Sequence, residues 1–158
     1  MESAANRVRP RVGGLLIQQK TILLVHIEIP TRPEPVWMPP GGEVEFTESV
    51  TTALQREFRE ETGLEIRTTR LLYVHEFIQE PYHAIEHYFL CSKVGGSLKT
   101  GKDPELKDDA QIIRKARFIP LADLKKYNIE PAFLKERLVA DWQQQALGQT
   151  YWIGTTRE

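Results

Sequence analysis

The sequence lacks the features that mark several specialised classes of protein. It has one cysteine, Cys91, in 158 residues, so no intrachain disulfide can form. The formal net charge is −1, which argues against a dedicated nucleic-acid binder, because such proteins usually carry a basic excess. No apolar run approaches the roughly 18 residues that a membrane helix needs. Residues 1–11 lack the apolar core of a secretory signal. We therefore expect a cytoplasmic protein that binds neither membranes nor nucleic acid polymers.

What is present is the composition of an ordinary globular domain. Hydrophobic residues make up 41% of the chain and charged residues 27%, a balance that gives no signature of disorder. The length suits one domain with a well-buried core. We expect a single domain over residues 11–147, an N-terminal extension over 1–10 and a C-terminal tail over 148–158.

Stretches rich in Val, Ile and Leu alternate with segments that favour turns. This pattern predicts strands at 12–18, 21–29, 64–78, 84–94 and 116–120. Helix formers fill residues 48–62, where Thr47 is a suitable N-cap and Gly63 a suitable C-cap. A second helix is expected from Pro131 to about Leu147. Strands with interspersed helices indicate an α/β domain with a mixed sheet covered by helices.

The helix predicted over residues 48–62 carries glutamates on its inward side. Each residue turns the helix by about 100°. With Glu57 at zero, Glu60 lies near about −60° and Glu61 near about +40°. The apolar Leu54 points in an overlapping direction, near about +60°. Solvated charges normally lie opposite the apolar stripe, so we expect these three glutamates to face the protein.

Three carboxylates on an inward face need a compensating positive charge, because they repel each other and lose hydration. Glu60 and Glu61 also lie near the end of the helix, where negative charge opposes the helix dipole. A divalent cation that prefers oxygen ligands, such as Mg²⁺ or Mn²⁺, would supply that charge. The alternative is a structural cluster held together by salt bridges.

The segment around this helix resembles the Nudix signature. That signature consists of Gly, five residues, Glu, seven residues, Arg-Glu, an apolar residue, any residue, Glu-Glu, any residue, Gly and an apolar residue. Its seven fixed positions are matched over 23 residues by Gly42, Glu48, Arg56, Glu57, Glu60, Glu61 and Gly63, and Leu64 follows. Phe58 stands where the family usually has an aliphatic residue, and we expect this difference to change local packing only.

The resemblance implies a fold and a metal site. Members of the family form an α/β/α sandwich around a mixed central sheet. By position, the ligands of one or more Mg²⁺ ions would be Glu57, Glu60, Glu61 and the carbonyl oxygen of Gly41. Mn²⁺ could substitute for Mg²⁺.

The resemblance also implies catalytic roles within the signature. The catalytic set would be Glu57, Glu60 and Arg56, and Glu57 is our choice for the residue that orients or deprotonates water. Arg56 would be mostly structural, pairing with Glu48 and orienting the acidic group. The residues expected to support the site structurally are Gly42, Glu48 and Gly63.

Residues outside the signature are harder to assign. Many relatives use a further acid from beyond it. The candidates here are Glu105, which we favour, and Asp108, Asp109 and Glu86, each of which could equally be a solvated charge. Tyr82 and Phe77 could stack on a substrate base or simply pack. His75 is expected to face solvent or a neighbouring residue.

The resemblance implies Mg²⁺-dependent hydrolysis of a pyrophosphate bond in a nucleoside diphosphate linked to another moiety. The substrate would be a nucleoside triphosphate, ADP-ribose or another nucleotide sugar, or a dinucleoside polyphosphate. One alternative is a Nudix-fold sensor that binds a nucleotide without cleaving it, although such proteins often lose the signature glutamates. Another is an isoprenyl diphosphate isomerase, for which Cys91 is a poor acid/base candidate. A homodimer is possible, since dimers are common among relatives.

Overall fold

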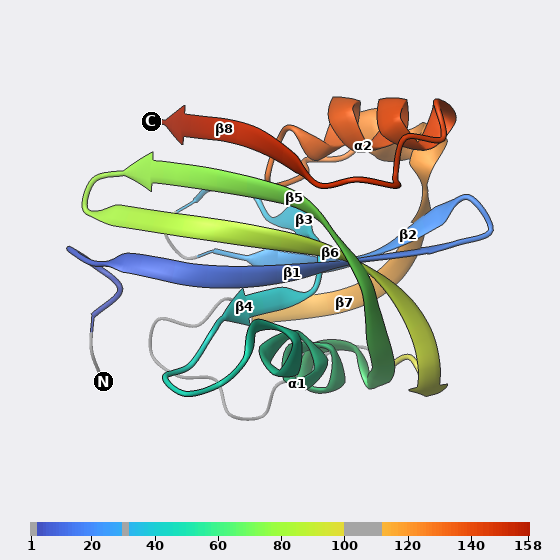
Figure 1. The fold of residues 1–158 in the computed structure, drawn as a ribbon, viewed down its shortest axis with the longest axis horizontal. Helices are drawn as coiled ribbons and strands as arrows, with labels where there is room; N and C mark the ends of the chain where they lie inside the picture. The colour runs from blue at the N-terminus through green and yellow to red at the C-terminus, as the bar shows by residue number, and fades with distance from the viewer. Residues whose placement is uncertain (1–2, 30–31, 100–111) are drawn as a thin grey trace.

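The computed structural model describes residues 3–29, 32–99 and 112–158. Within these ranges the strands join into one sheet, and helices lie on both sides of it (Figure 1). The elements in chain order are β1 (Val8–Gln18), β2 (Thr21–Glu28), β3 (Val36–Met38), β4 (Gly41–Glu43), α1 (Val50–Thr62), β5 (Leu64–Gln79), β6 (Tyr82–Gly96), β7 (Ile112–Pro120), the 3₁₀ helix η1 (Leu121–Lys126), α2 (Leu134–Gln143) and β8 (Tyr151–Arg157).

The sheet is mixed. Its main path runs β3-β2-β1-β6-β5-β8, with β4 paired to β1 and β7 paired to β2. β1 lies parallel to β6, β5 lies antiparallel to β6, and β8 lies parallel to β5. This confirms the predicted α/β class with a mixed central sheet.

Two apolar cores hold the layers together. On one face, Leu54 and Phe58 of α1 pack with buried strand residues such as Leu23. On the other face, Leu134 and Leu138 of α2 pack with strand residues and with η1. Figure 1 shows α1 and α2 on opposite sides of the sheet. The architecture is therefore an α/β/α sandwich, as the sequence predicts.

Two strands extend beyond the boundaries expected for the domain. β1 begins at Val8, inside the segment 1–10 that was expected to be an extension. Tyr151–Arg157, assigned to a C-terminal tail, forms β8 and pairs with β5. Both differences have one cause: these segments gain their hydrogen bonds from strands that are distant in sequence, so the local pattern carries little of the signal.

The helix ends also differ in part from expectation. α1 begins at Val50, and its N-cap is Ser49, whose Oγ accepts a hydrogen bond from the Thr52 N–H at 3.1 Å. The prediction of Thr47 as N-cap is wrong, because Thr47 has a positive φ of 70° and lies in the preceding loop. Gly63 is the C-cap, with a φ of 78°, as predicted. α2 is shorter at both ends than the helix expected from Pro131 to Leu147.

Candidate active site

The end of α1 packs against the two glycines at the start of β4. The Gly41 N–H donates a hydrogen bond to Glu61 Oε2 at 2.9 Å. A methyl group on Gly41 would collide with the carbonyl oxygen of Val12. A methyl group on Gly42 would lie only 2.5 Å from Glu57 Oε1. Glycine is needed at both positions because backbone and carboxylates approach so closely.

Arg56 is the positive charge at the centre of the signature. Its Nε and Nη2 donate to the two carboxylate oxygens of Glu48, at 2.8 and 3.0 Å. Its Nη1 donates to Glu57 at 2.9 Å and lies 3.5 Å from Glu60. Such a two-point contact fixes the plane of the guanidinium group. Arg56 thus holds Glu57 and Glu60 in a defined position relative to the loop that carries Glu48.

The electrostatics of the three glutamates differ. Burial is the main cause that raises the pKa of Glu57, and the Arg56 guanidinium opposes it. Burial also raises the pKa of Glu61 well above its usual range, and repulsion from Glu57 adds to that effect. The side chain of Glu60 is 57% exposed. The expectation that all three face inward is therefore wrong for Glu60, which lies at the edge of the helix face and reaches solvent.

The donor set fits a hard divalent cation. Glu57, Glu60 and Glu61 offer only carboxylate oxygens, and Arg56 contributes one positive charge against three negative ones. Repulsion among these carboxylates is part of what raises the pKa of Glu57 and Glu61, so a further cation would stabilise their charged forms. Among the described residues, no three His, Cys, Asp or Glu side chains already converge as a ligand set. The candidate acids Glu105, Asp108 and Asp109 lie outside the described residues.

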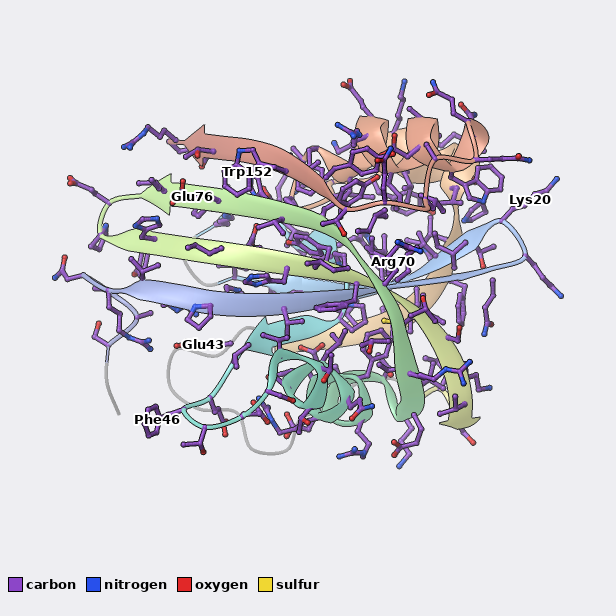
Figure 2. All side chains as sticks on the ribbon, viewed as in Figure 1. Lys20, Glu43, Phe46, Arg70, Glu76 and Trp152 are labelled. Carbon is purple, nitrogen blue, oxygen red and sulfur yellow. The ribbon has the colours of Figure 1, made fainter. Side chains whose placement is uncertain are left out.

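A cavity of about 510 Å³ lies on the sheet face toward the segment before α2. Three arginines line it, Arg9, Arg11 and Arg32. Arg9 pairs with Glu43 at 3.0 Å, and Figure 2 shows Glu43 at the end of β4, before the loop that leads to α1. Its wall also includes His75, Phe77, Tyr82, Glu86, Glu130 and Phe133.

Arg11 connects this cavity with the signature glutamates. It lines the cavity, and its positive charge lowers the pKa of both Glu57 and Glu61. Arg32, by contrast, is paired with Glu130 at 2.6 Å. Arg11 is half-buried, and within the described ranges none of the ion pairs involves its side chain. Its charge is therefore available to an anionic ligand that spans the cavity and the glutamates.

The described residues outside the signature that the sequence predicts to take part in the site lie in or around the cavity. Phe77 and Tyr82 both lie on the cavity wall. Their contact with a substrate stays a prediction, and the cavity is where that contact would occur. Glu86 lies in the same cavity, bonded to His75. His75 is only 3% exposed, so of the two expected environments, solvent or a neighbouring residue, it has the second, with Glu86 and Thr156 as its partners. The arginines of β1 were missed, although their spacing at every second residue is the signal of one strand face.

Comparison with known proteins agrees with this architecture. The NUDIX domain family model matches residues 7–142. The chain therefore belongs to the Nudix family. It is 38% identical over 89 residues to an 8-oxo-dGDP phosphatase from Danio rerio, an alignment covering 56% of this chain and 26% of the relative. It is 36% identical over 107 residues to an ADP-ribose pyrophosphatase from Methanocaldococcus jannaschii, covering 66% of this chain and 56% of the relative. The chain thus spans about a quarter of the first relative and little more than half of the second.

Solved structures show the same fold. A crystal structure of a UDP-X diphosphatase superposes with a TM-score of 0.69 at 23% identity, covering 94% of this chain and 68% of that one. The crystal structure of a MutT protein from Methanosarcina mazei Go1 gives a TM-score of 0.68 at 19% identity, covering 89% and 96%. At these identities the likeness is one of fold. Across the described ranges, no helix is both long and apolar enough to cross a membrane.

Proposed function

We propose that this protein is a Mg²⁺-dependent pyrophosphohydrolase acting on a nucleoside diphosphate linked to another moiety. The observation that carries the proposal is the contact of Glu57 and Glu61 with Gly41 and Gly42 of β4, a strand that pairs with β1, where Arg11 lines the cavity. Carboxylates that can hold a metal thus lie beside a cavity that can hold a nucleoside. Arg11 lines the cavity, and its charge also acts on Glu61.

The metal ligands in this proposal come from the end of α1 and from β4. Glu57, Glu60, Glu61 and the Gly41 carbonyl oxygen would hold Mg²⁺, and Mn²⁺ could replace it. When bound, the ion would neutralise phosphate charge and make water a better nucleophile. Arg56 keeps Glu57 and Glu60 in place through its hydrogen bonds.

The chain's own residues then orient the substrate and accept a proton. Glu57 has one oxygen held by Arg56, and its other oxygen makes no hydrogen bond among the described residues, so it can accept the proton of an attacking water. Arg11 can hold a phosphate oxygen of the diphosphate by a charge-assisted hydrogen bond. The aromatic walls, Phe77 and Tyr82, offer faces on which a base can stack.

The substrate range follows from the cavity and the relatives. A volume of about 510 Å³ falls in the range of small-molecule sites and can hold a nucleoside. The relatives named above act on 8-oxo-dGDP and ADP-ribose, to judge by their names. We include nucleoside triphosphates, nucleotide sugars and dinucleoside polyphosphates in the proposed range. Cytoplasmic location and a homodimer stay predictions from the sequence.

A substrate screen tests this proposal. The purified protein is incubated with nucleotide sugars, dinucleoside polyphosphates, and normal and oxidised nucleoside diphosphates and triphosphates. We expect hydrolysis with Mg²⁺, no hydrolysis in excess EDTA, and recovery when Mg²⁺ or Mn²⁺ is restored. Tight calorimetric binding of one of these nucleotides, with no turnover under any metal condition, would contradict the proposal and favour the nucleotide sensor.

A further inference from the structure

Glu86 is a carboxylate that the fold fixes inside the cavity. It lies on β6, opposite His75 of β5 in the antiparallel register and beside Arg11 of β1 in the parallel register. His75 Nδ1 lies 2.7 Å from Glu86 Oε1, and His75 Nε2 lies 2.8 Å from the hydroxyl of Thr156 on β8. The carboxylate on β6 is therefore held by His75 of β5, which is held in turn by Thr156 of β8.

Both nitrogens of His75 have partners, which fixes the orientation of Glu86. A neutral imidazole with its proton on Nδ1 donates to Glu86, and the Thr156 hydroxyl can donate to Nε2. The ring of His75 also packs on Phe133, with the ring centres 5.0 Å apart. Because His75 is buried, it cannot turn away without losing these contacts.

Glu86 keeps acceptor capacity after these contacts are made. A carboxylate can accept about four hydrogen bonds. His75 supplies one of them. The remaining lone pairs belong to a side chain that lines the cavity together with Phe77 and Tyr82. A fixed acceptor next to aromatic walls suits a planar or ring-shaped ligand that carries hydrogen-bond donors.

The opposite face of the same strands carries a matched pair. His83 Nε2 lies 2.7 Å from Glu76 Oε2, and the Thr155 hydroxyl donates to Glu76 Oε1 at 2.7 Å. Glu76, on β5 (Figure 2), is not among the residues that line the cavity. The two pairs share their chemistry and their strands and differ in their access to the cavity.

We propose that Glu86 is a specificity-determining residue, which accepts hydrogen bonds from two adjacent donors on the nucleoside part of the substrate. Such donors occur on the N–H and amino edge of a guanine-type base and on the vicinal hydroxyls of a ribose. His75 is the positioning residue for this carboxylate. The inference deepens the proposed function, but it concerns binding and can be measured without hydrolysis.

The test is a set of nucleotide affinities measured by calorimetry in EDTA, so that no turnover occurs. GDP and IDP differ only in the exocyclic amino group, and ADP and dADP differ only in the 2′-hydroxyl. The wild type should favour the nucleotide with the extra donor in one of these pairs by roughly tenfold to a hundredfold. The pair that responds identifies the base edge or the ribose as the source of the donors.

The variants assign this preference to Glu86. Glu86→Gln should lose the preference within the responding pair, because the amide N–H₂ of glutamine is a hydrogen-bond donor and cannot accept hydrogen bonds from the donors of the ligand. Glu76→Gln should keep it, and thermal unfolding should show that both variants are folded. If the wild type bound GDP no more tightly than IDP, and ADP no more tightly than dADP, the proposal would be overturned before any variant is measured. An unchanged preference in folded Glu86→Gln would overturn it as well. A protein that hydrolyses nothing yet shows the Glu86-dependent preference would refute the proposed activity alone.

Discussion

At the scale of single residues, burial decides which chemical groups can react. Cys91 lies in the core on the α1 side of the sheet, with Phe58. Its Sγ would be 3.2 Å from a methyl group placed on Gly14. Burial raises the pKa of the Cys91 thiol to about 12. The thiol is therefore protonated at neutral pH, and Cys91 is not among the described residues that line the cavity, which makes it unsuited to the acid/base role that an isoprenyl diphosphate isomerase needs.

This gives a prediction for thiol reactivity. Because the raised pKa keeps the neutral form through pH 9, native protein at pH 8 should react with iodoacetamide far more slowly than the same protein in denaturant. Mass spectrometry of timed samples measures the modified fraction. Rapid modification of the native protein at the rate of a free thiol would show that Cys91 is accessible and ionised.

At the scale of elements, α1 depends on its two ends. Ser49 caps the N-terminus through its side chain, and Gly63 closes the C-terminus in a left-handed conformation. The C-cap was predictable because a glycine that directly follows a run of helix formers commonly ends the helix in this way. The N-cap was not, because Thr47 and Ser49 are both good capping residues and the loop geometry chooses between them.

Substitution of the two candidates should separate them. Ser49→Ala removes the hydrogen bond to the Thr52 N–H and should lower the free energy of unfolding by about 1 kcal/mol. Thr47→Ala should change it much less, since no such hydrogen bond is made there. Urea denaturation of both variants measures the difference. Equal losses, or a larger loss for Thr47→Ala, would contradict the assigned cap.

The contact between β4 and α1 sets the position of Glu57. A methyl group on Gly42 would lie 2.5 Å from Glu57 Oε1, which is too close for an unshifted side chain. Gly42→Ala should therefore lower kcat by roughly tenfold or more, because small displacements of catalytic groups are costly, while the protein stays folded. Gly148→Ala is the control, since the added methyl group has no atom of the described residues within 4 Å beyond its own chain neighbours. Equal activity of the two variants would show that this contact has no part in catalysis.

At the scale of the whole molecule, features that follow from local sequence patterns could be predicted, and features that depend on long-range contacts could not. The signature helix, its glutamates and the mixed sheet could be inferred, because they follow from periodicity and from a motif confined to residues 42–64. β8 and the cavity could not. The cavity brings together Arg11 of β1, the β5–β6 pair with His75 and Glu86, and Phe133 before α2, and no short-range sequence pattern predicts that these segments meet.

The same division explains why the sequence could not decide whether His75 faces solvent or a neighbouring residue. Its neighbours Glu76 and His83 do form a solvent-side pair, but strand alternation turns His75 to the opposite face. There it is enclosed by Glu86, Phe133 and Thr156. Only the pairing of β5 with β6 and β8 determines that environment.

In the proposed function, the end of α1 binds the metal and the cavity binds the nucleoside, and Glu61 is the residue on which the metal site depends most. Glu61→Gln keeps the size of the side chain and an oxygen that can accept the Gly41 N–H, but it removes the negative charge. The control is Glu65→Gln, which removes a more exposed carboxylate paired with Arg59.

The measurement is the rate of Mg²⁺-dependent hydrolysis of the best substrate by folded Glu61→Gln relative to wild type. We predict a loss of about 100-fold or more, since a metal ligand contributes several kcal/mol to the transition state, and near-normal activity for Glu65→Gln. Hydrolysis by Glu61→Gln at close to the wild-type rate would contradict the assignment of the metal site.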